Sequence, residues 1–458
     1  MFKKILIANR GEIAIRIIRA CREIGIETVA VHSDVDRESL HVKLADQSVC
    51  IGPAPAAESY LNIPAIISAA EITGADAIHP GYGFLSENTH FADVCQSVGI
   101  KFIGPNPESI KMMGDKIEAR KLVAKYGGIP LLPSSEGTVD PEDPHLLKLA
   151  KKIGYPIMVK ARAGGGGKGM RVVYEEANLK NSIFAAQTEA KASFKESGVY
   201  LEKFLENPRH VEVQIAGDAF GNVVSFPERD CTIQRRHQKL VEESPSPLFN
   251  DKLRKKIGKA ARRTARAAKY VTVGTVEFLF DGKKQFYFLE MNTRIQVEHP
   301  VTEIVTGIDL VKEQIRLAAG EKLGYSKDDV KLLGHSIECR INAEDPDRDF
   351  APSPGKITSV VFPGGPGVRV DTHIYGGYTV PTHYDSLLGK VIVGSSRGRE
   401  AAVLRMSRAL REFEIEGIKT TIPFLRKVMV HPAFKKGEYS TNFIEKYFSN
   451  NGNGNSRK

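Results

Sequence analysis

The sequence has no tryptophan and only five cysteines among its 458 residues. The cysteines are scattered and odd in number, which argues against a disulfide framework and against a zinc site; they are Cys21, Cys50, Cys95, Cys231 and Cys339. No apolar run approaches the roughly 20 residues of a membrane span. The N-terminus also lacks the shape of a signal peptide. We therefore expect a cytoplasmic protein that does not interact with membranes.

Acidic residues are outnumbered by basic ones, since the sequence has 55 aspartates and glutamates and 65 lysines and arginines, for a net charge of +10. The densest basic run, residues 251–270, has small and apolar residues at helical spacing with basic residues between them. No aromatic residue that would stack on a base precedes Tyr270 in this run. The run therefore predicts a solvated amphipathic helix and no nucleic-acid contact. A nucleic-acid-binding protein stays as an alternative, and salt-dependent DNA binding without ATPase activity would favour it.

Residues 1–104 alternate between strand and helix patterns. The predicted elements are strands at 4–9, 26–32, 75–80 and 101–104 and helices at 11–25 and 63–74. Such alternation indicates a doubly wound parallel sheet. The first strand is followed by Gly11 without the rest of a dinucleotide fingerprint, so nucleotide binding is not expected there. The loop 79–88, HPGYGFLSEN, follows a strand at the sheet edge where such folds bind ligands.

The chain divides by pattern into three domains and a tail. We place an N-terminal domain at 1–113, a central domain at 114–330, a C-terminal domain at 331–448 and a disordered tail at 449–458. Within the central domain, residues about 130–205 have the pattern of a small α/β flap. The flap is predicted to contain a hairpin, a helix around 176–196 and a strand at 199–205.

Four consecutive glycines, residues 164–167, follow a predicted strand in KARAGGGGKGM. A Walker A loop is excluded, because Arg162 and Gly169 stand where it needs a glycine and a hydroxyl residue. The dinucleotide pattern matches by spacing, but a strand rather than a helix follows the glycines. Strand, glycine loop and strand make a hairpin, which predicts a phosphate-binding flap. A glycine-rich hairpin without a ligand is the alternative.

Two carboxylates are expected to face each other in the hairpin around DGKK. If the turn is centred between the two lysines of that motif, Glu277 lies opposite Glu290. Like charges in that position require a cation between them or a proton on one of them. Asn292 shares the face of Glu290, and two carboxylates with an amide oxygen suit Mg²⁺ or Mn²⁺. An exposed sheet face whose carboxylates pair with lysines is the alternative.

The segment TRIQVEHP directly follows this hairpin. If it is extended, Arg294, Gln296 and Glu298 alternate onto the face of Asn292. An arginine fork, an amide and a carboxylate would hold a small planar anion and place a base beside it. An ordinary salt bridge between Arg294 and Glu298 is the alternative.

Several other basic residues fit either an anion site or a solvated surface. They are Lys116, Lys160, Arg235, Arg236, His237 and Lys239. The last four crowd one short segment, which suits a phosphate or bicarbonate lining as well as a basic loop. A lone Arg340 in an alternating strand decides nothing by itself.

Taken together and in order, these motifs resemble the biotin carboxylase family within the ATP-grasp superfamily. The matching segments include ANRGEIAIRIIRA, HPGYGFLSEN, MGDK, KARAGGGGKGM, LEKFLENPRHVEVQI, RDCTIQRRHQK, FLEMNTRIQVEHPVTE and CRINAEDP. The similarity covers residues 2 to about 446. It implies an α/β protein with a Rossmann-like N-terminal domain, an ATP-grasp central domain with a mobile lid and a C-terminal α+β domain.

The resemblance also implies a reaction. ATP phosphorylates bicarbonate to carboxyphosphate, which yields CO₂ and phosphate, and the CO₂ attaches to N1 of biotin carried on a protein lysine. A base is needed, because bicarbonate is a poor nucleophile until it loses its proton. Another ATP-grasp ligase would share the flap and the carboxylates but would not be expected to combine TRIQVEHPVTE with CRINAEDP. A catalytically inactive homologue is disfavoured by the intact carboxylates and arginines.

Site residues follow from the resemblance position by position. It implies ATP contacts for Lys116, Lys160, Gly166, Gly167, Glu202, Lys203, Phe204, Leu205, His210 and His237. It implies ligands for Mg²⁺ or Mn²⁺, at two sites, for Glu277, Glu290 and Asn292. It implies bicarbonate binding for Lys239, Arg294, Gln296 and Val297. The implied catalytic set is Lys239, Arg294, Glu298 and Arg340, with Glu298 as general base and Arg340 as the residue that binds biotin and stabilises its enolate.

The expected partners also follow from the resemblance. Lys168 and Pro366 depart from the pattern of some family members, the second at a dimer contact, whereas Arg16, Arg19 and Glu23 fit that contact, so we expect a homodimer. The sequence has no Met-Lys-Met biotinylation motif, so we expect a separate biotin carboxyl carrier protein and carboxyltransferase subunits. Acetyl-CoA carboxylase of fatty acid synthesis is the expected complex. A split pyruvate or other acyl-CoA carboxylase is the alternative.

Overall fold

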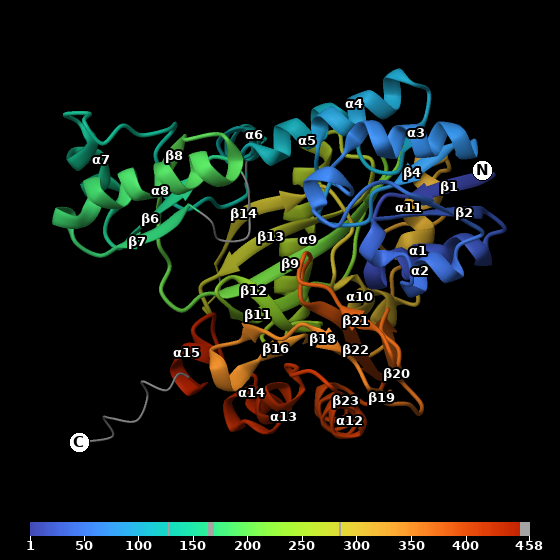
Figure 1. Ribbon diagram of the computed structural model, residues 1–458. Helices are drawn as coiled ribbons and strands as arrows, with labels where there is room; N and C mark the ends of the chain where they lie inside the picture. The colour runs from blue at the N-terminus through green and yellow to red at the C-terminus, as the bar shows by residue number, and fades with distance from the viewer. Residues whose placement is uncertain (127, 164–168, 284, 449–458) are drawn as a thin grey trace.

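The computed structural model describes residues 1–126, 128–163, 169–283 and 285–448 (Figure 1). The predictions for Gly166, Gly167 and Lys168 and for the tail 449–458 lie outside these residues. Within the described residues, none of the helices is both long and apolar enough to cross a membrane.

The N-terminal region contains a parallel sheet in the order β3-β2-β1-β4-β5. Its elements are β1 (Lys4–Ile7), α1 (Gly11–Glu23), β2 (Glu27–His32), α2 (Leu40–Leu44), β3 (Gln47–Cys50), α3 (Ile63–Thr73), β4 (Ala77–His79), α4 (Thr89–Ser97) and β5 (Lys101–Phe102). The predicted doubly wound sheet is therefore confirmed. The sequence pattern does not predict β3, because this edge strand is largely exposed and has no apolar alternation.

Helices α5 (Pro107–Gly114) and α6 (Lys116–Lys125) lead into the flap, which extends to the left of the molecule in Figure 1. Its strands pair antiparallel in the order β7-β6-β8. The flap elements are α7 (Leu146–Ile153), β6 (Ile157–Ala161), β7 (Met170–Val173), α8 (Leu179–Phe194) and β8 (Val199–Lys203). The predicted hairpin is confirmed, because Lys160 pairs with Met170 across β6 and β7.

A second sheet runs through the centre of the molecule in the order β14-β13-β9-β11-β12-β15-β22-β20, with β10 beside β9. Its strands are β9 (Arg209–Gly217), β10 (Val223–Ser225), β11 (Arg229–Arg235), β12 (Gln238–Ser244), β13 (Thr272–Phe280), β14 (Phe286–Asn292), β15 (His335–Asn342), β20 (Val368–Thr372) and β22 (Leu387–Ser395). The pairing of β12 with β15 carries the sheet across position 331, so the predicted central and C-terminal domains share one sheet. The domain boundary at that position stays a prediction.

Helices and short strands complete the C-terminal half. The helices are α10 (His299–Thr306), α11 (Leu310–Ala318), α12 (Arg399–Glu412), α13 (Ile422–Val430), α14 (Pro432–Lys436) and α15 (Phe443–Phe448). The short strands are β16 (Glu344–Asp345), β17 (Ala351–Pro352), β18 (Gly355–Lys356), β19 (Ser359–Val361), β21 (Thr379–Val380) and β23 (Glu414–Glu416). Met406 of α12 and Leu425 of α13 join Ile337 and Val391 of the sheet in one apolar core. This core anchors the end of the sheet that carries β15.

Helix α9 (Asp251–Ala267) is the amphipathic helix predicted from the basic run. Ile257, Ala261 and Thr264 are buried, while Lys255 and Lys256 are exposed. The basic run is therefore the solvated face of a helix that covers one side of the central sheet (Figure 1).

Strand β13 lies between two buried layers, and its alternation separates them. Val276, Phe278 and Phe280 pack with α9 in an apolar core. The Phe278 ring lies 5.3 Å from that of Phe286, edge to face. Glu277, by the period of two, belongs to the opposite face, where charged residues of neighbouring strands gather. The apolar layer therefore fixes the strand that presents Glu277 to the candidate site.

We expect Phe278→Ala to lower the free energy of unfolding by about 3–5 kcal/mol, the usual cost of emptying a buried phenylalanine site. Phe278 is 0% exposed, whereas Phe184 on α8 is 67% exposed and serves as the matched control. Phe184→Ala should change the free energy by less than about 0.5 kcal/mol. Chemical denaturation of the two variants measures both values, and equal losses would contradict the packing described for β13.

Candidate active site

A half-buried lysine lies at the centre of an acidic cluster on the charged face of the central sheet. The Nζ atom of Lys239 on β12 donates hydrogen bonds to Glu212 at 2.6 Å, to Glu277 at 2.9 Å and to Glu298 at 2.6 Å. All three carboxylates are buried. Because an ammonium group has three donors and each one reaches a carboxylate, the cluster is held together by a single cation.

The same contacts set the charge of the carboxylates. Burial alone would raise the pKa of Glu277 and that of Glu298. The charges of Lys239 and His210 outweigh burial and hold the pKa of Glu277 well below its usual range. Lys239 and Arg340 do the same for the pKa of Glu298. Both side chains are therefore ionised at neutral pH.

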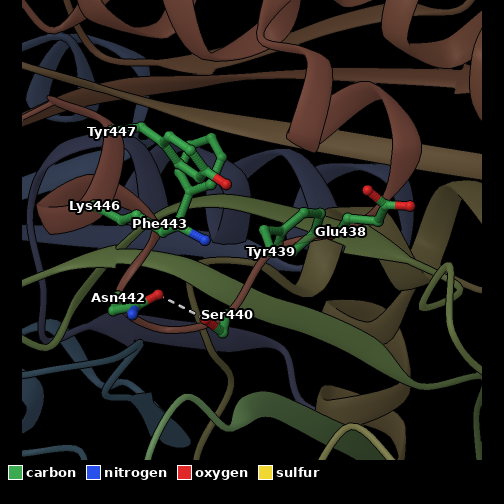
Figure 2. Close-up of a pocket in the computed structure, with 7 residues that line it drawn as sticks. All are labelled: Glu438, Tyr439, Ser440, Asn442, Phe443, Lys446 and Tyr447. Atoms are coloured by element: carbon green, nitrogen blue, oxygen red, sulfur yellow. Dashed lines mark hydrogen bonds between the residues drawn. The ribbon is translucent and has the colours of Figure 1, made fainter. Parts of the chain in front are cut away.

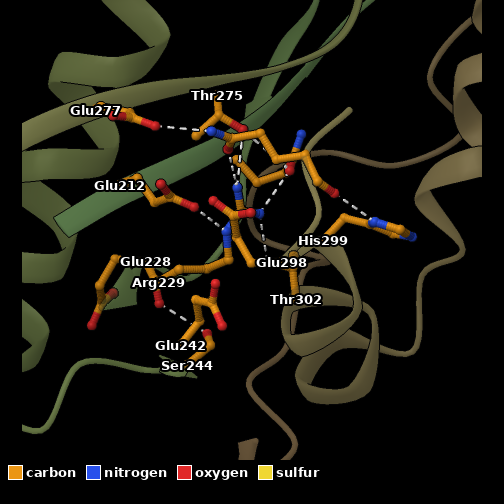
Figure 3. A network of polar contacts seen from close by, with 12 residues as sticks. Glu212, Glu228, Arg229, Glu242, Ser244, Thr275, Glu277, Glu298, His299 and Thr302 are labelled. Carbon is orange, nitrogen blue, oxygen red and sulfur yellow. Dashed lines mark hydrogen bonds and ion pairs between the residues drawn. The ribbon is translucent and has the colours of Figure 1, made fainter. Parts of the chain in front are cut away.

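A second cation, Arg229 on β11, is completely buried, and its side chain extends between Glu212 and Glu298 (Figure 3). Its guanidinium donates to Glu212 at 2.5 Å, Gln214 at 2.7 Å, Thr275 at 3.0 Å, Gln296 at 2.7 Å and Thr302 at 3.1 Å. The sequence analysis does not single out Arg229 or Glu212. The signal that would find them is a charged residue inside a strand that is otherwise buried, since such residues are rarely buried without a partner.

The prediction that Glu277 lies opposite Glu290 is confirmed by the strand register. Near the turn, Phe280 pairs with Phe286, so the turn is centred on Lys283 rather than after it. An irregularity beside Glu277 shifts the register and restores the predicted pair. The alternative of an exposed sheet face is wrong for Glu277, which is only 4% exposed.

The predicted metal ligands occupy adjacent strands. The Nδ2 atom of Asn292 donates to Glu277 at 2.9 Å. The Nζ atom of Lys116 lies 3.9 Å from a carboxylate oxygen of Glu290. His210, predicted to contact ATP, has its Nε2 atom 2.8 Å from the other oxygen of Glu277. Cationic and amide groups therefore compensate the facing carboxylates.

Three groups of side chains have donor atoms suited to a metal ion. Ligand atoms within 4.8 Å of one another are found in His210, Glu212 and Glu277, and in Glu212, Cys231 and Glu298. Lys239 donates to carboxylates of both groups, and one of them, Glu277, also belongs to the predicted metal set. Glu277, Glu290 and Asn292 offer an all-oxygen set from two paired strands. That set fits the oxygen preference of Mg²⁺.

The chain after β14 bends at Arg294 and turns at Val297 and Glu298, so that α10 begins directly after Glu298. The prediction of an extended segment is therefore wrong. The side chains still reach the same place, because Gln296 donates to Glu277 at 2.9 Å and Glu298 accepts from Lys239. The alternative salt bridge is also wrong, since Arg294 pairs with Glu87 at 2.8 Å instead of with Glu298.

Arg340 on β15 lies between two acidic side chains. Its Nε atom donates to Glu242 at 2.5 Å, and its Nη2 atom donates to Glu298 at 2.9 Å. The backbone next to Glu298 is also held, because the carbonyl of Val297 accepts a 2.5 Å hydrogen bond from the buried Lys390. Glu298 thus has one cation on each carboxylate oxygen and a fixed main chain.

The residues predicted to contact ATP lie at the base of the flap. The Nζ atom of Lys160 donates to Glu202 at 2.8 Å, and both side chains are buried. Arg120, which the sequence analysis does not single out, also binds Glu202. The Nζ atom of Lys203 donates to the carbonyl of Tyr155 at 2.6 Å, so its charge lies against the turn between α7 and β6.

The neighbouring residues Phe204 and Leu205 follow β8 at the edge of the flap. Both are half-buried. The amide of Phe204 donates to the carbonyl of Pro156 at 3.0 Å, which ties this segment to the start of β6. The two residues therefore lie where the flap joins the central sheet.

The basic segment between β11 and β12 divides into two parts. Arg235 and Arg236 form ion pairs with Asp349 at 2.6 Å and 2.7 Å, so they do not line an anion site with Lys239. His237 has a positive φ of 66° at the turn of the hairpin. Although its ring is accessible, the atoms packed around it and the charges of Lys160 and His210 lower the pKa of His237. His237 therefore lies near Lys160 and His210, which are also predicted to contact ATP.

A separate pocket of about 210 Å³ opens in the C-terminal domain (Figure 2). Its lining consists of Glu438, Tyr439, Ser440, Asn442, Phe443, Lys446 and Tyr447. Among the described residues, none of those predicted to bind ATP, metal, bicarbonate or biotin lines it. The pocket is therefore not part of the candidate site.

A shallower depression of about 390 Å³ lies on another surface and brings together the residues predicted for a dimer contact. Arg16, Arg19 and Glu23 of α1 line it together with Arg369 of β20. Arg16 is itself held by Glu303 at 2.8 Å. The depression is therefore lined by residues from both the N-terminal and the C-terminal parts of the chain.

Behind Arg340, two buried carboxylates face each other on paired strands. Glu338 of β15 is the register partner of Glu242 of β12. Glu242 accepts from Arg340, whereas neither oxygen of Glu338 has a hydrogen-bond partner among the described residues. Burial raises the pKa of Glu338 well above its usual range, although Lys390 and Arg340 oppose this, and Glu242 and Glu298 add to it. The proton of this pair therefore belongs on Glu338.

Comparison with known protein families divides the chain into three matching segments. Residues 1–110 match the biotin carboxylase N-terminal domain, and residues 338–446 match the biotin carboxylase C-terminal domain. Residues 115–326 match the ATP-binding domain of the carbamoyl-phosphate synthase L chain. These segments follow the order of the architecture described above.

Curated relatives are similar along nearly their whole length. The biotin carboxylase of Nostoc sp. is 58% identical over 444 residues, which cover 97% of this chain and 99% of the relative. Biotin carboxylase 1 of Bacillus subtilis is 53% identical over 448 residues, which cover 98% of this chain and 99% of the relative. The similarity therefore includes every part of the candidate site.

Solved structures give the same result. A biotin carboxylase–β-γ-ATP complex from Campylobacter jejuni has a TM-score of 0.95 and 49% identity, and covers 98% of this chain and 99% of its own. The dimeric biotin carboxylase domain of Hydrogenobacter thermophilus 2-oxoglutarate carboxylase, in complex with MgADP, ADP and bicarbonate, has a TM-score of 0.94 and 48% identity. This second comparison covers 97% of this chain and 97% of the Hydrogenobacter chain.

We expect Glu338→Gln to flatten the pH dependence of stability. A carboxyl group whose pKa is raised by folding stabilises the folded state at pH values below its ordinary pKa. This stabilisation is lost as the pH rises to the pKa of the group in the folded state. The glutamine variant stays neutral, so its Tm should fall less than that of the unmodified chain between pH 6 and pH 9. Scanning calorimetry measures the difference, and Glu414→Gln at an exposed position of β23 is the control. Parallel Tm profiles for the Glu338 variant and the unmodified chain would contradict a protonated Glu338.

Proposed function

The chain belongs to the biotin carboxylase family of ATP-dependent carboxylases, and from that premise we propose that its acidic cluster carboxylates biotin held on a separate carrier protein. ATP phosphorylates bicarbonate to carboxyphosphate, which releases CO₂ and phosphate, and N1 of biotin takes up the CO₂. The observation that carries the proposal is the contact of Lys239 with Glu277 and Glu298. It supports the proposal, because one cation then lies between Glu277 of the proposed metal set and Glu298, the proposed base.

We assign the bicarbonate site to Lys239, Arg294, Gln296 and the backbone at Val297. The first two supply positive charge, and an arginine fork matches the planar shape of a carboxylate-like anion. Gln296 is fixed between Arg229 and Glu277, at 2.7 Å and 2.9 Å. The site is therefore rigid before the anion arrives, which reduces the cost of ordering it on binding.

Glu298 is the general base in this proposal. It is ionised and buried, and it shares Lys239 with the proposed anion site. A carboxylate in that position can take the proton of bicarbonate, which then attacks the terminal phosphorus of ATP. Arg340, bonded to the other oxygen of Glu298, is assigned to the ureido oxygen of biotin, where it would stabilise the enolate.

ATP is assigned to the base of the flap, with Lys116, Lys160, Glu202, His210 and His237 around it. Phe204 and Leu205, beside β8, are assigned to the same nucleotide site, and so is Lys203, although its charge is directed at the carbonyl of Tyr155. Glu277, Glu290 and Asn292 would hold Mg²⁺ or Mn²⁺ at two sites. The metal, when bound, neutralises negative charge on the phosphate oxygens.

The flap is assigned the role of a lid. Carboxyphosphate is quickly lost to water, so the reaction requires a cover over the phosphates. The β6–β7 hairpin leads directly to the glycine run, and Lys160 lies at its edge. The backbone contacts proposed for Gly166 and Gly167 would come from this cover.

The proposed partners are a biotin carboxyl carrier protein, carboxyltransferase subunits and a second copy of the chain. The dimeric state of the Hydrogenobacter domain supports a homodimer, and the depression around Arg16, Arg19 and Glu23 is its proposed contact. Acetyl-CoA carboxylase is the proposed complex. The biotin carboxylase subunit of a pyruvate carboxylase is 48% identical and is covered to 98%, against 58% and 99% for the Nostoc biotin carboxylase, so the alternative complex is not better supported. A cytoplasmic location stays a prediction.

We expect Glu298→Gln to lower bicarbonate- and biotin-dependent ATP cleavage by about 10²–10⁴-fold, the usual contribution of a general base. ATP should still bind, because Glu298 is not assigned to the nucleotide. Steady-state phosphate release and calorimetric titration with ATP measure the two quantities. Glu321→Gln, at an exposed position after α11, should behave like the unmodified chain. Unchanged turnover of the Glu298 variant would refute its role as base.

We expect Glu290→Lys to lose Mg²⁺-dependent ATP turnover, because the substitution replaces a proposed metal ligand by a cation beside Lys116. Turnover measured across a Mg²⁺ titration shows the effect directly. The charge-matched control is Glu321→Lys, which should keep the normal Mg²⁺ dependence. A normal Mg²⁺ dependence of the Glu290 variant would count against the ligand assignment.

A further inference from the structure

We propose that Glu87 of the N-terminal domain is a positioning residue for the bicarbonate-binding side chain of Arg294, an inference that rests on the proposed function. Glu87 belongs to the loop HPGYGFLSEN, which stands where a doubly wound sheet binds ligands. In this protein the loop also contacts the central domain. Through that contact the loop would orient a cation of the neighbouring domain.

Both oxygens of Glu87 contact the segment that carries Arg294. One oxygen accepts from the Nε atom of Arg294 at 2.8 Å. The other accepts from the backbone amide of Thr293 at 2.9 Å and from its hydroxyl at 3.2 Å. The carboxylate therefore fixes both the main chain before the arginine and the guanidinium itself.

The remaining edges of the guanidinium are held by its own segment. Its Nη2 atom donates to the side-chain oxygen of Asn292 at 2.9 Å, and its Nη1 atom donates to the carbonyl of Ile295 at 3.2 Å. Those two partners are neighbours in sequence and move with Arg294. Glu87 lies 207 residues away along the chain, so it is the contact that fixes the arginine relative to another domain.

The loop that carries Glu87 is built to be rigid. The side-chain amide of Asn9, after β1, donates to the carbonyl of Pro80 at 2.7 Å and to that of Tyr82 at 2.8 Å. Gly81 has a φ of 62°, and a Cβ atom there would lie 2.8 Å from the Asn9 amide. Glycine is therefore required for the loop to pass this close to β1.

Packing also holds the next turn of the loop. Phe84 has a φ of 39°, which is unfavourable for a residue with a side chain, and its ring stacks on Tyr60 with centroids 5.0 Å apart. Strain of this kind persists only where the surroundings determine the conformation, and it is concentrated at functional positions. Asn88 then caps α4 by accepting from the amide of Phe91 at 2.9 Å. Glu87 is thus presented from a fixed turn.

The ion pair is too exposed to serve mainly as a stabilising contact. The side chains of Arg294 and Glu87 are 22% and 39% exposed. Exposed pairs of this kind contribute about 0–1 kcal/mol to stability. Loss of Glu87 should therefore be seen in the binding of the anion that Arg294 holds, rather than in the stability of the fold.

The test is Glu87→Gln, which keeps the shape of the side chain and removes its charge. We measure kcat, the KM for bicarbonate and the KM for ATP of the full chain with free biotin as acceptor, together with Tm. The KM for bicarbonate should rise by about fivefold, the upper end for a partly exposed pair, while the KM for ATP stays within about twofold. The Tm should fall by less than about 2 °C. The matched control, Asp93→Asn on the exposed face of α4, should leave every value unchanged.

An unchanged or lower KM for bicarbonate would overturn the inference, as would equal changes of both KM values. Arg294→Lys separates this failure from failure of the proposed function. If Arg294→Lys raises the KM for bicarbonate and Glu87→Gln does not, only the role of Glu87 is wrong. If neither variant changes it, the assignment of bicarbonate to Arg294 is wrong. In the Arg294→Lys background, Glu87→Gln should add less than it does alone, because both act through one contact.

Discussion

The structure of the site depends on one constraint, which is that three buried carboxylates share a single ammonium. Glu212, Glu277 and Glu298 each lie within hydrogen-bonding distance of Lys239. Removal of one partner from such a group leaves buried charge without compensation, at a cost of about 3–5 kcal/mol. The four side chains come from β9, β12, β13 and the turn before α10. The order of strands in the central sheet is therefore also the order that brings these charges together.

Neutrality elsewhere in the site is reached by similar means. Arg229 satisfies Glu212 from β11, and Arg340 satisfies Glu298 and Glu242 from β15. Because β15 belongs to the C-terminal domain and Glu87 to the N-terminal domain, each outer domain supplies a charged side chain to the central one. The three domains are thus joined at the candidate site by ion pairs, and the central and C-terminal domains also share a sheet. A change at a domain contact would alter the geometry of the cations.

Much of the fold and part of the site follow from the sequence, because periodicity is a local property. The alternation in 274–292 placed Glu277 opposite Glu290, and the structure agrees in spite of an irregularity that the pattern does not reveal. Arg229 and Glu87 are different. Arg229 stands out only as a charge in a buried strand, which does not reveal its partners on other strands, and Glu87 contacts an arginine 207 residues away. Such contacts depend on the packing of domains, which spacing along one strand does not encode. The other site residues contributed by distant parts of the chain, such as Arg340, were predicted only through the resemblance to a known family.

The charge state of Glu298 links this compensation to the proposed chemistry. The cations that keep Glu298 ionised also make it a weak base, because a carboxylate with a lowered pKa holds a proton poorly. A bicarbonate ion bound between Lys239 and Arg294 draws on the same positive charge. Its own negative charge lies close to Glu298, and like charges raise a carboxyl pKa. In the proposed reaction, arrival of bicarbonate would therefore strengthen Glu298 as a base, while Lys239 and Arg294 would weaken the hold of bicarbonate on its proton. A base that becomes effective only when the anion is present would protect ATP from transfer to water in the absence of bicarbonate.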